Sequence, residues 1–202
     1  MNRNELVAKV PEEVNNTPKH KFNSSYIYEV AERLGCKASH GATRLVLIFP
    51  KHGWVIKIPY GNRNYCAQEV QSYHTAVEYG VEKLLLSIEK VGETAHGIPL
   101  YIQPMYKTSV YDMSSRARNK VCQLCGKTTN RRTIAKIRYG CYYSPESDWI
   151  ARATQLYGKR FMRSFEEWTR EFQVNDLHNA NIGYISGYRP VLVDYAGFGN
   201  FE

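Results

Sequence analysis

The sequence lacks any run of about 18 apolar residues, the length that a membrane-spanning helix needs. It also lacks the apolar stretch of a secretion signal, because residues 1–22 are mostly polar. The cysteines number five, and an odd count fits free thiols better than a complete set of disulfides. Together these absences predict a protein of the reducing cytoplasm that has no membrane partner.

Internal repeats and low-complexity tracts are absent as well. The chain has 202 residues, of which 43% are hydrophobic. This is enough apolar material for the core of one domain, or of one domain with two lobes. Length and composition therefore predict a globular protein.

Acidic residues are nearly missing from residues 107–138, which we call the basic segment. Asp112 is its one acidic residue, against nine basic ones: Lys107, Arg116, Arg118, Lys120, Lys127, Arg131, Arg132, Lys136 and Arg138. The basic segment accounts for the formal net charge of +8, so the rest of the chain is close to neutral. Such charge attracts an acidic protein surface or, less favoured, a nucleic acid. The alternative is a solvated helical face with a loop, which is what most runs of charge are.

Helical spacing of apolar residues is found in three ranges. Residues 24–35 begin with serine as a cap and end at Gly35, residues 64–79 form a second helix, and residues 108–172 are largely helical. Residues 1–22 combine polar side chains with two prolines, and we expect them to be loosely structured.

One face of the last helical range is aromatic. Its members follow at spacings of four, three and four: Phe161, Phe165, Trp168 and Phe172. This spacing places them on one side of a helix, where they predict core packing rather than a platform for stacking bases.

Strand patterns alternate with these helices. Residues 43–60 contain two β-rich runs that flank Pro-Lys-His-Gly, which predicts a hairpin, and residues 98–106 form a strand that ends in a loop. Residues 180–197 predict a closing hairpin turned by Ser-Gly-Tyr, whereas residues 81–92 fit either a short helix or a strand. Strands first and helices after them predict an α+β protein of two layers.

Polar side chains concentrate in Val-Asn-Asp-Leu-His-Asn-Ala-Asn-Ile-Gly at 174–183. Asn181 follows Asp176 by five residues, and Asp194 lies thirteen residues further, at the end of the closing hairpin. The hairpin is expected to bring Asp194 beside Asn181, and two such oxygen donors suit Mg²⁺. Asp176 is then left to accept a proton from a hydroxyl, which completes the groups that phosphoryl transfer needs. The simpler interpretation is that Asp176 and Asn181 only cap a turn.

These residues resemble a known family. Asn-Asp-Leu-His-Asn-Ala-Asn is similar to the catalytic loop of the protein kinase-like fold, and Val-Asp-Tyr-Ala-Gly at 193–197 to its metal-binding Asp-Phe-Gly element. Trp-Val-Ile-Lys-Ile-Pro resembles the family's third strand, whose phosphate-pairing lysine would be Lys57. Glu69, twelve residues later, occupies the place of the ion-pair partner.

Two further stretches match the family in order. Tyr-Ile-Gln-Pro-Met-Tyr-Lys looks like the fifth strand and hinge, so the backbones of Gln103 and Met105 would face adenine, with Ile102 as gatekeeper. Residues 37–46 take the place of the glycine-rich loop, in which Gly41 is the glycine left at the turn.

The resemblance implies ATP and Mg²⁺ as cofactors and a role for each matching residue. Lys57 would hold the α- and β-phosphates, Glu69 would orient Lys57, and Asp176 would accept the proton of the hydroxyl. Asn181 and Asp194 would bind Mg²⁺.

The fold that the resemblance implies is a two-lobed kinase-like fold with a truncated C-lobe. Asp194 lies eight residues before Glu202, and the family's substrate-binding helices would follow it. The expected parts are an N-terminal extension at 1–23, an N-lobe at 24–105 and a helical C-lobe at 106–202.

The sequence departs from the family pattern in two of these motifs. Val174-Asn175-Asp176 replaces His-Arg-Asp, and Tyr195-Ala196 replaces Phe-Gly. The compact layout looks most like the short early Ser/Thr kinases of lytic bacteriophages, which phosphorylate host proteins. Two alternatives stay open: a pseudokinase that binds and blocks a partner through its basic segment, and a small-molecule kinase of the aminoglycoside or choline type.

Two smaller candidate sites each have a simpler explanation. Cys122, Cys125 and Cys141 have part of a zinc ligand set, but no second Cys-x-x-C pair follows, so free thiols are favoured. His178 fits a metal ligand or an acid, or a residue that positions a substrate phosphate or simply packs.

Overall fold

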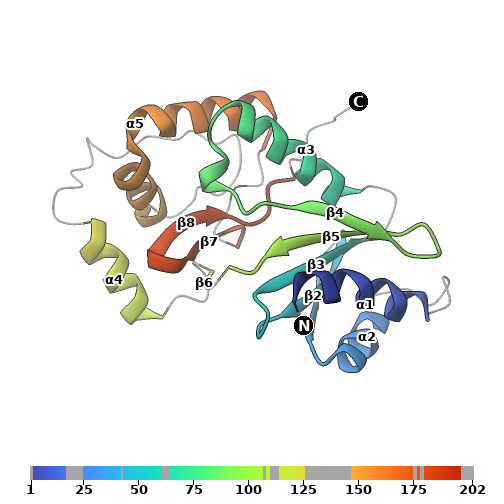
Figure 1. Cartoon of the computed structure of the whole chain (residues 1–202). Helices are drawn as coiled ribbons and strands as arrows, with labels where there is room; N and C mark the ends of the chain where they lie inside the picture. Colours follow the sequence, from blue (N-terminus) through green and yellow to red (C-terminus); the bar gives the residue numbers. More distant parts are fainter. Residues whose placement is uncertain are drawn as a thin grey trace. The chain divides into compact units, whose positions relative to one another are not determined.

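The structure is a computed structural model that describes residues 2–16, 25–41, 43–60, 64–106, 108–109, 114–125, 147–174, 177 and 180–196. The chain divides into two compact units. Unit 1 contains residues 1–70 and 87–105, and unit 2 contains residues 71–86 and 106–202. Helices and antiparallel strands occur together, so the predicted α+β class is confirmed (Figure 1).

Unit 1 is built on a five-stranded antiparallel sheet with the order β1-β2-β3-β5-β4. Its strands are β1 (Lys37–His40), β2 (Arg44–Phe49), β3 (Trp54–Pro59), β4 (Glu89–Glu93) and β5 (Pro99–Pro104). The predicted hairpin is the β2–β3 pair, and Gly53 supplies the positive φ of +74° that its turn requires. The strand predicted at 98–106 is β5.

Helix α1 (Arg3–Asn15) contradicts the prediction of loose structure for residues 1–22. Its start is fixed by a capping box, in which the side chains of Asn2 and Glu5 each accept from the other's backbone N–H. Leu6, Val10 and Val14 recur every fourth residue, so they share one face, and all three are buried. The prediction was wrong because this apolar face outweighs the polar composition and the proline within the helix.

Helix α2 (Tyr26–Leu34) lies beside α1 in unit 1 (Figure 1). It ends as predicted at Gly35, whose φ of +63° is the left-handed conformation common after a helix. The expected serine cap is wrong in detail, because Ser25 stands at the N-cap position but makes no capping side-chain bond. Arg33 ties the two helices together through a bond of 3.0 Å from Nε to Glu13 Oε2.

The helix predicted at 64–79 is α3 (Tyr65–Glu78), and it continues from unit 1 into unit 2. Asn64 caps its start, since Asn64 Oδ1 accepts from the N–H of Ala67 at 3.0 Å. The ambiguous range 81–92 contains both kinds of structure: the 3₁₀ turn η2 (Glu82–Leu84) and the beginning of β4.

Unit 2 contains a three-stranded antiparallel sheet with the order β6-β7-β8. Its strands are β6 (Thr108–Ser109), β7 (Ile182–Ile185) and β8 (Arg189–Leu192). The predicted closing hairpin is the β7–β8 pair, and the 3₁₀ turn η3 (Ser186–Tyr188) joins its strands. The short strand β6 was not predicted, because two residues carry no recognisable pattern.

Two helices complete unit 2: α4 (Ser115–Cys125) and α5 (Ser147–Glu171). Phe165 and Trp168 are fully buried, as predicted for the aromatic face. Helix α5 bends at Gly158, whose φ of +83° and ψ of +164° are not helical (Figure 1). Trp149, before the bend, donates from Nε1 to the carbonyl of Gly183 at 3.2 Å and so anchors α5 to β7.

None of the described helices has the length and apolar character that crossing a membrane requires.

Candidate functional site

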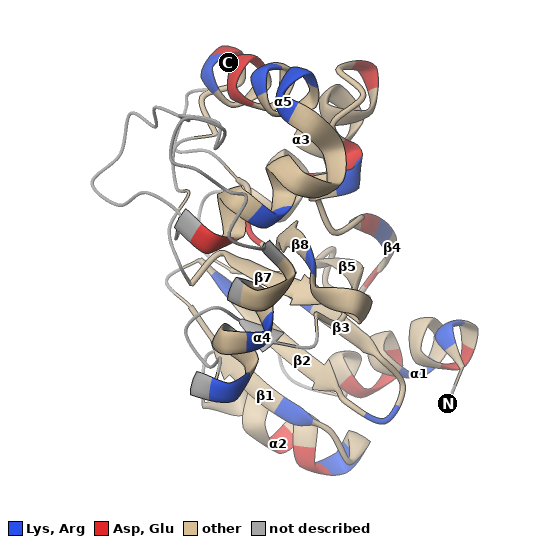
Figure 2. Cartoon of the chain, turned by 90° about the vertical axis from the view of Figure 1, so that its left-hand side faces the viewer, with Lys and Arg blue, Asp and Glu red and all other residues tan. Residues whose placement is uncertain are grey.

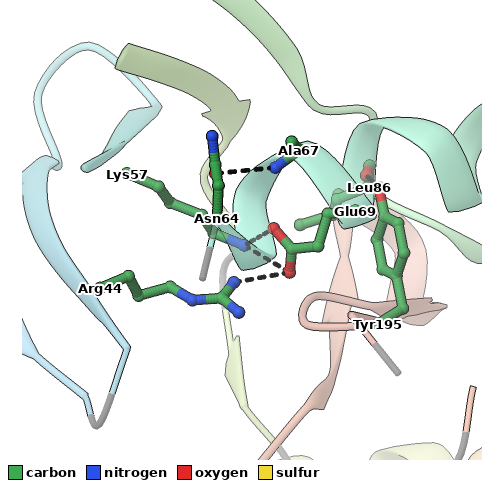
Figure 3. A network of polar contacts seen from close by, with 7 residues as sticks. All are labelled: Arg44, Lys57, Asn64, Ala67, Glu69, Leu86 and Tyr195. Atoms are coloured by element: carbon green, nitrogen blue, oxygen red, sulfur yellow. Dashed lines mark hydrogen bonds and ion pairs between the residues drawn. The ribbon is translucent and has the colours of Figure 1, made fainter. Parts of the chain in front are cut away.

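The structure brings Lys57 and Glu69 together in unit 1 (Figure 3). Lys57 lies in the middle of β3, and Glu69 lies in the second turn of α3. The Lys57 Nζ donates to both carboxylate oxygens, at 3.1 Å to Oε1 and 2.9 Å to Oε2. Lys57 is 6% exposed and Glu69 is fully buried, so this ion pair is largely shielded from water.

Arg44 is a third member of this cluster, and the sequence did not identify it. Its Nη1 donates to Glu69 Oε1 at 2.8 Å, the same oxygen that Lys57 reaches (Figure 3). Arg44 begins β2 and is 8% exposed. A charged residue at the start of a strand is typical of a solvated strand edge. The carboxylate that pairs with Arg44 lies 25 residues later in the sequence, and only the fold brings the two side chains together.

Two cations therefore bind one buried carboxylate. Charges that leave water lose several kcal/mol of hydration each, by order of magnitude, and they are tolerated when paired through good hydrogen bonds. The three charge-assisted bonds, between 2.8 and 3.1 Å, have that geometry. Their common acceptor, Glu69, holds Lys57 and Arg44 in fixed positions, which is what a site that binds an anion needs.

In unit 2 the β7–β8 hairpin brings Asn181 and Asp194 to one end. Ile182 is paired with Leu192, and the N–H of Val193 donates to the carbonyl of Asn181 at 2.8 Å. Val193 is therefore the residue opposite Asn181, and Asp194 is the next residue along the chain, so both polar residues lie at the same end of the hairpin. Asn181 is 8% exposed and Asp194 is partly exposed.

The segment before β4 fixes the same hairpin end from the other side. Leu85 forms a parallel bridge with Leu192, and the N–H of Leu86 donates to the carbonyl of Leu192 at 3.0 Å. The carbonyl of Leu86 in turn accepts from the hydroxyl of Tyr195 at 2.6 Å (Figure 3). Asp194 therefore lies between two residues, Val193 and Tyr195, that are each held by hydrogen bonds.

The chemistry of Asn181 and Asp194 fits a hard cation. An amide oxygen and a carboxylate oxygen are ligand types that Mg²⁺ accepts, and Mg²⁺ usually takes only one or two carboxylates from a protein. Among the residues that the structure describes, no cluster of three or more His, Cys, Asp and Glu side chains is placed to hold a metal.

The proposed base Asp176 lies outside the described residues, and so does His178. The described residues on either side are anchored. Val174 is buried and its N–H donates to the carbonyl of Thr169 at 2.9 Å, while Leu177 is 1% exposed.

The residues expected to contact adenine belong to unit 1. Gln103 is buried in β5 opposite Val55. Met105 follows that strand, and its N–H donates to the carbonyl of Gly53 at 2.8 Å. That N–H is therefore already bonded, and an adenine contact at Met105 would have to use its carbonyl oxygen.

Gly41, the glycine expected in the glycine-rich loop, directly follows β1. The Gly41 N–H donates to the carbonyl of Arg44 at 2.9 Å, and its carbonyl accepts from the hydroxyl of Tyr60 at 2.5 Å. The backbone of Gly41 is thereby bonded on both sides, to the first residue of β2 and to Tyr60 after β3. Ile102, the expected gatekeeper, is buried in β5 opposite Ile56.

The basic segment is described only in part. Arg116 and Lys120 of α4 are exposed, and the side chain of Arg118 lies outside the described residues. Figure 2 shows in blue that basic residues occur along α4. The other basic residues are also outside them: Lys107, Lys127, Arg131, Arg132, Lys136 and Arg138.

The cysteines expected as a zinc set or as free thiols fall in the same region. The side chains of Cys122 and Cys125, and the whole of Cys141, lie outside the described residues. Neither of the two cysteines with described side chains, Cys36 and Cys66, is in a disulfide.

Two comparisons with known proteins give no match. A scan against known protein families finds no match, and a search of curated protein sequences finds none either. The functional argument therefore depends on the residues and their geometry.

Proposed function

We propose that the protein transfers the terminal phosphoryl group of ATP to a hydroxyl, that of a Ser or Thr in a protein substrate. In this proposal the chain has a two-lobed kinase-like fold, with an N-lobe at 24–105 and a short C-lobe at 106–202. Host proteins are the proposed substrates, in keeping with the resemblance to short bacteriophage kinases.

The buried pairing of Lys57 with Glu69 carries the proposal. Lys57 lies in mid-strand and is only 6% exposed, so its charge is not there to be solvated. A hydrophobic residue would fill this position at a lower desolvation cost. A lysine held rigidly by a carboxylate from the next helix, however, is well suited to bind phosphate oxygens. The resemblance to the kinase-like fold implied such a pair, with Glu69 twelve residues after Lys57.

The hairpin end with Asn181 and Asp194 supports the same reaction. We propose that these two residues hold Mg²⁺, which when bound neutralises negative charge on the phosphate chain. Asp194 contributes a carboxylate from a backbone fixed on both sides, and Asn181 contributes an amide oxygen from a buried position. Asp176 is the proposed base that accepts the hydroxyl proton of the substrate.

Nucleotide binding and transfer are tested separately. ATP with Mg²⁺ is expected to raise the melting temperature of the full chain, because a ligand that binds only the native state stabilises it. Lys57→Met should weaken this shift, and Asp194→Asn should remove most of its dependence on Mg²⁺. Lys51→Met, at an exposed position of the β2–β3 turn, is the matched control and should leave the shift unchanged.

Transfer is measured with labelled ATP and cell lysate. Asp176→Ala should retain ATP binding but reduce transfer by about 10²-fold or more, since a positioned base typically contributes 10²–10⁴-fold. Transfer by Asp176→Ala at the rate of the wild type would contradict the role of Asp176. ATP binding without transfer by the wild type would favour the pseudokinase alternative, and transfer only to small hydroxyl compounds would favour a small-molecule kinase.

A further inference from the structure

A hollow of about 790 Å³ lies beside α4 in unit 2, and we call it the α4 groove. Polar side chains line it: Ser114, Arg116, Asn119, Lys120, Gln123 and Tyr188. The first five come from α4 and the residue before it, and Tyr188 comes from the turn η3. No acidic side chain is among the described residues that line this groove, whereas Arg116 and Lys120 are both exposed in it.

Both walls of the α4 groove are attached to the same helix, α5. Arg152 donates from Nε to the carbonyl of Tyr188 at 3.3 Å and from Nη2 to that of Gly187 at 3.4 Å, which holds the turn. Gln155 donates from Nε2 to the carbonyl of Leu124 at 2.7 Å, which holds α4. A bond of 2.6 Å from Arg152 Nη1 to Gln155 Oε1 joins the two attachments. The groove is therefore shaped before any ligand arrives, and preformed sites lose less entropy on binding.

The lining chemistry selects the class of ligand. Two cations without an acidic neighbour in the described lining call for an anionic ligand. Asn119 and Gln123 each offer an amide donor and an amide acceptor, which match the N–H and C=O groups of a peptide backbone. A nucleic-acid strand offers acceptors along its phosphates, and its bases favour a row of aromatic side chains, of which this lining has only Tyr188.

The spacing of the two cations gives a more specific expectation. Arg116 and Lys120 are four residues apart on α4, so they share one face and are separated by about 6 Å along the helix axis. Alternate residues of an extended peptide are about 6.8 Å apart and point to the same side. We propose that the α4 groove binds an extended acidic segment of a partner protein, with carboxylates at alternate positions facing Arg116 and Lys120. This binding is independent of phosphoryl transfer and requires no nucleotide.

The test is a titration of the full chain, without nucleotide, with a fluorescent peptide that has glutamate at alternate positions. Saturable binding that weakens as salt is added is expected, because ions screen exposed charges beyond about 8 Å at 0.15 M. The double variant Arg116→Glu/Lys120→Glu should weaken binding by about tenfold or more. Reversing these two exposed charges changes the net charge of the groove by four units and turns both attractions into repulsions. The matched control is Arg160→Glu/Arg163→Glu, which makes the same charge change on an exposed face of α5 and should bind like the wild type.

A second variant tests the shape of the groove without changing its charge. Gln155→Met removes the bonds to Leu124 and Arg152, and it should lower the affinity for the peptide several-fold. The melting temperature of the protein should stay within a few degrees of that of the wild type. Equal loss of binding in both charge-reversal variants would overturn the proposal, because binding would then follow net charge alone. Tighter binding of a single-stranded RNA than of the peptide would also overturn it, in favour of a nucleic-acid site. The titration contains no nucleotide, so its result does not depend on whether the protein binds ATP. A failure of the proposed phosphoryl transfer is therefore distinguishable from a failure of peptide binding in the α4 groove.

Discussion

Arg44 donates from Nη1 to Oε1 of Glu69 at 2.8 Å, and both side chains are buried. Lys57 donates to the same carboxylate, so Glu69 is a shared partner of two cations. A carboxylate in this position organises the site, because removing it leaves Arg44 and Lys57 close together in a region of low dielectric.

Glu69→Ala is therefore expected to lower the free energy of unfolding by about 3–5 kcal/mol, as the removal of one partner from a buried ion pair usually does. Urea denaturation measures the loss. The matched control is Glu93→Ala, which removes a carboxylate from an ion pair with Lys90 at the surface. This control should leave the denaturation midpoint close to that of the wild type, since exposed pairs are screened by solvent. Equal effects of the two changes would contradict the importance of burial.

The N-terminal helix is expected to contribute to the stability of unit 1. Leu6 is fully buried in α1 and belongs to the same hydrophobic core as Leu45 and Ile56 of the sheet. Leu6→Ala should reduce the free energy of unfolding by about 2–5 kcal/mol, from lost burial and the cavity left behind. Lys9→Ala, on the exposed side of the same helix, should change it little. A midpoint unchanged by Leu6→Ala would mean that α1 is detached in solution.

Tyr195 stands where the kinase-like pattern has phenylalanine, and its hydroxyl has a structural role. It is fully buried and donates to the carbonyl of Leu86 at 2.6 Å. Tyr195→Phe keeps the ring but withdraws this donor, so we expect a loss of about 1–3 kcal/mol in the free energy of unfolding. Tyr28→Phe is the control, because Tyr28 is 49% exposed and water can replace its hydrogen bond to His40. Equal stability of Tyr195→Phe and the wild type would show that the hydroxyl bond adds nothing.

The thiol of Cys36 is predicted to react slowly. Burial raises the pKa of Cys36 to about 11. The reactive thiolate is therefore scarce at pH 8, and alkylation by iodoacetamide should be on the order of 10²-fold slower in the folded protein than in urea, where the pKa returns to about 8.5. Mass spectrometry of the peptide that contains Cys36 measures the rate. Rapid labelling at pH 8 in the folded state would contradict the raised pKa.

The same pKa has a consequence for stability. Between about pH 8.5 and pH 11 the unfolded chain releases the Cys36 proton and the folded chain keeps it, so the unfolded state binds fewer protons. The contribution of Cys36 to the free energy of unfolding therefore falls as the pH rises through this window and is complete below it. Cys36→Ser, whose hydroxyl does not titrate here, should show a smaller decline when denaturation is followed across the same range.

Local patterns in the sequence predicted the parts of the fold that local physics determines. The β2–β3 turn needs a residue with positive φ, and Gly53 marks it. Likewise Gly35 marks the end of α2, and Ser-Gly-Tyr marks the β7–β8 turn. Asn181 and Asp194 were expected beside each other because a hairpin fixes which of its residues are opposite each other, and the structure pairs Asn181 with Val193, the residue before Asp194.

The features that the sequence did not predict depend on partners far along the chain. Arg44 is buried only because Glu69 lies opposite it in the fold. Helix α1 has a narrow apolar face, with Leu6, Val10 and Val14 buried and Val7 packed beside them, and such a face predicts a helix only if there is a sheet for it to cover. The α4 groove needs Arg152 and Gln155, which reach it from another helix. No local pattern signals such contacts.

The bend at Gly158 divides α5 into two arms with different neighbours. The first arm contains Arg152, which holds the turn beside the α4 groove. The second arm contains Trp168, whose Nε1 donates to Oγ1 of Thr75 in α3 at 3.0 Å. An L-residue at position 158 would be strained by a φ of +83°, so glycine keeps the two arms distinct. The exposed side chains of the first arm can therefore change, and the ligand preference of the surface with them, while the buried rings of Trp149 and Phe165, whose centroids lie 6.2 Å apart, keep the two arms packed together in the interior of unit 2.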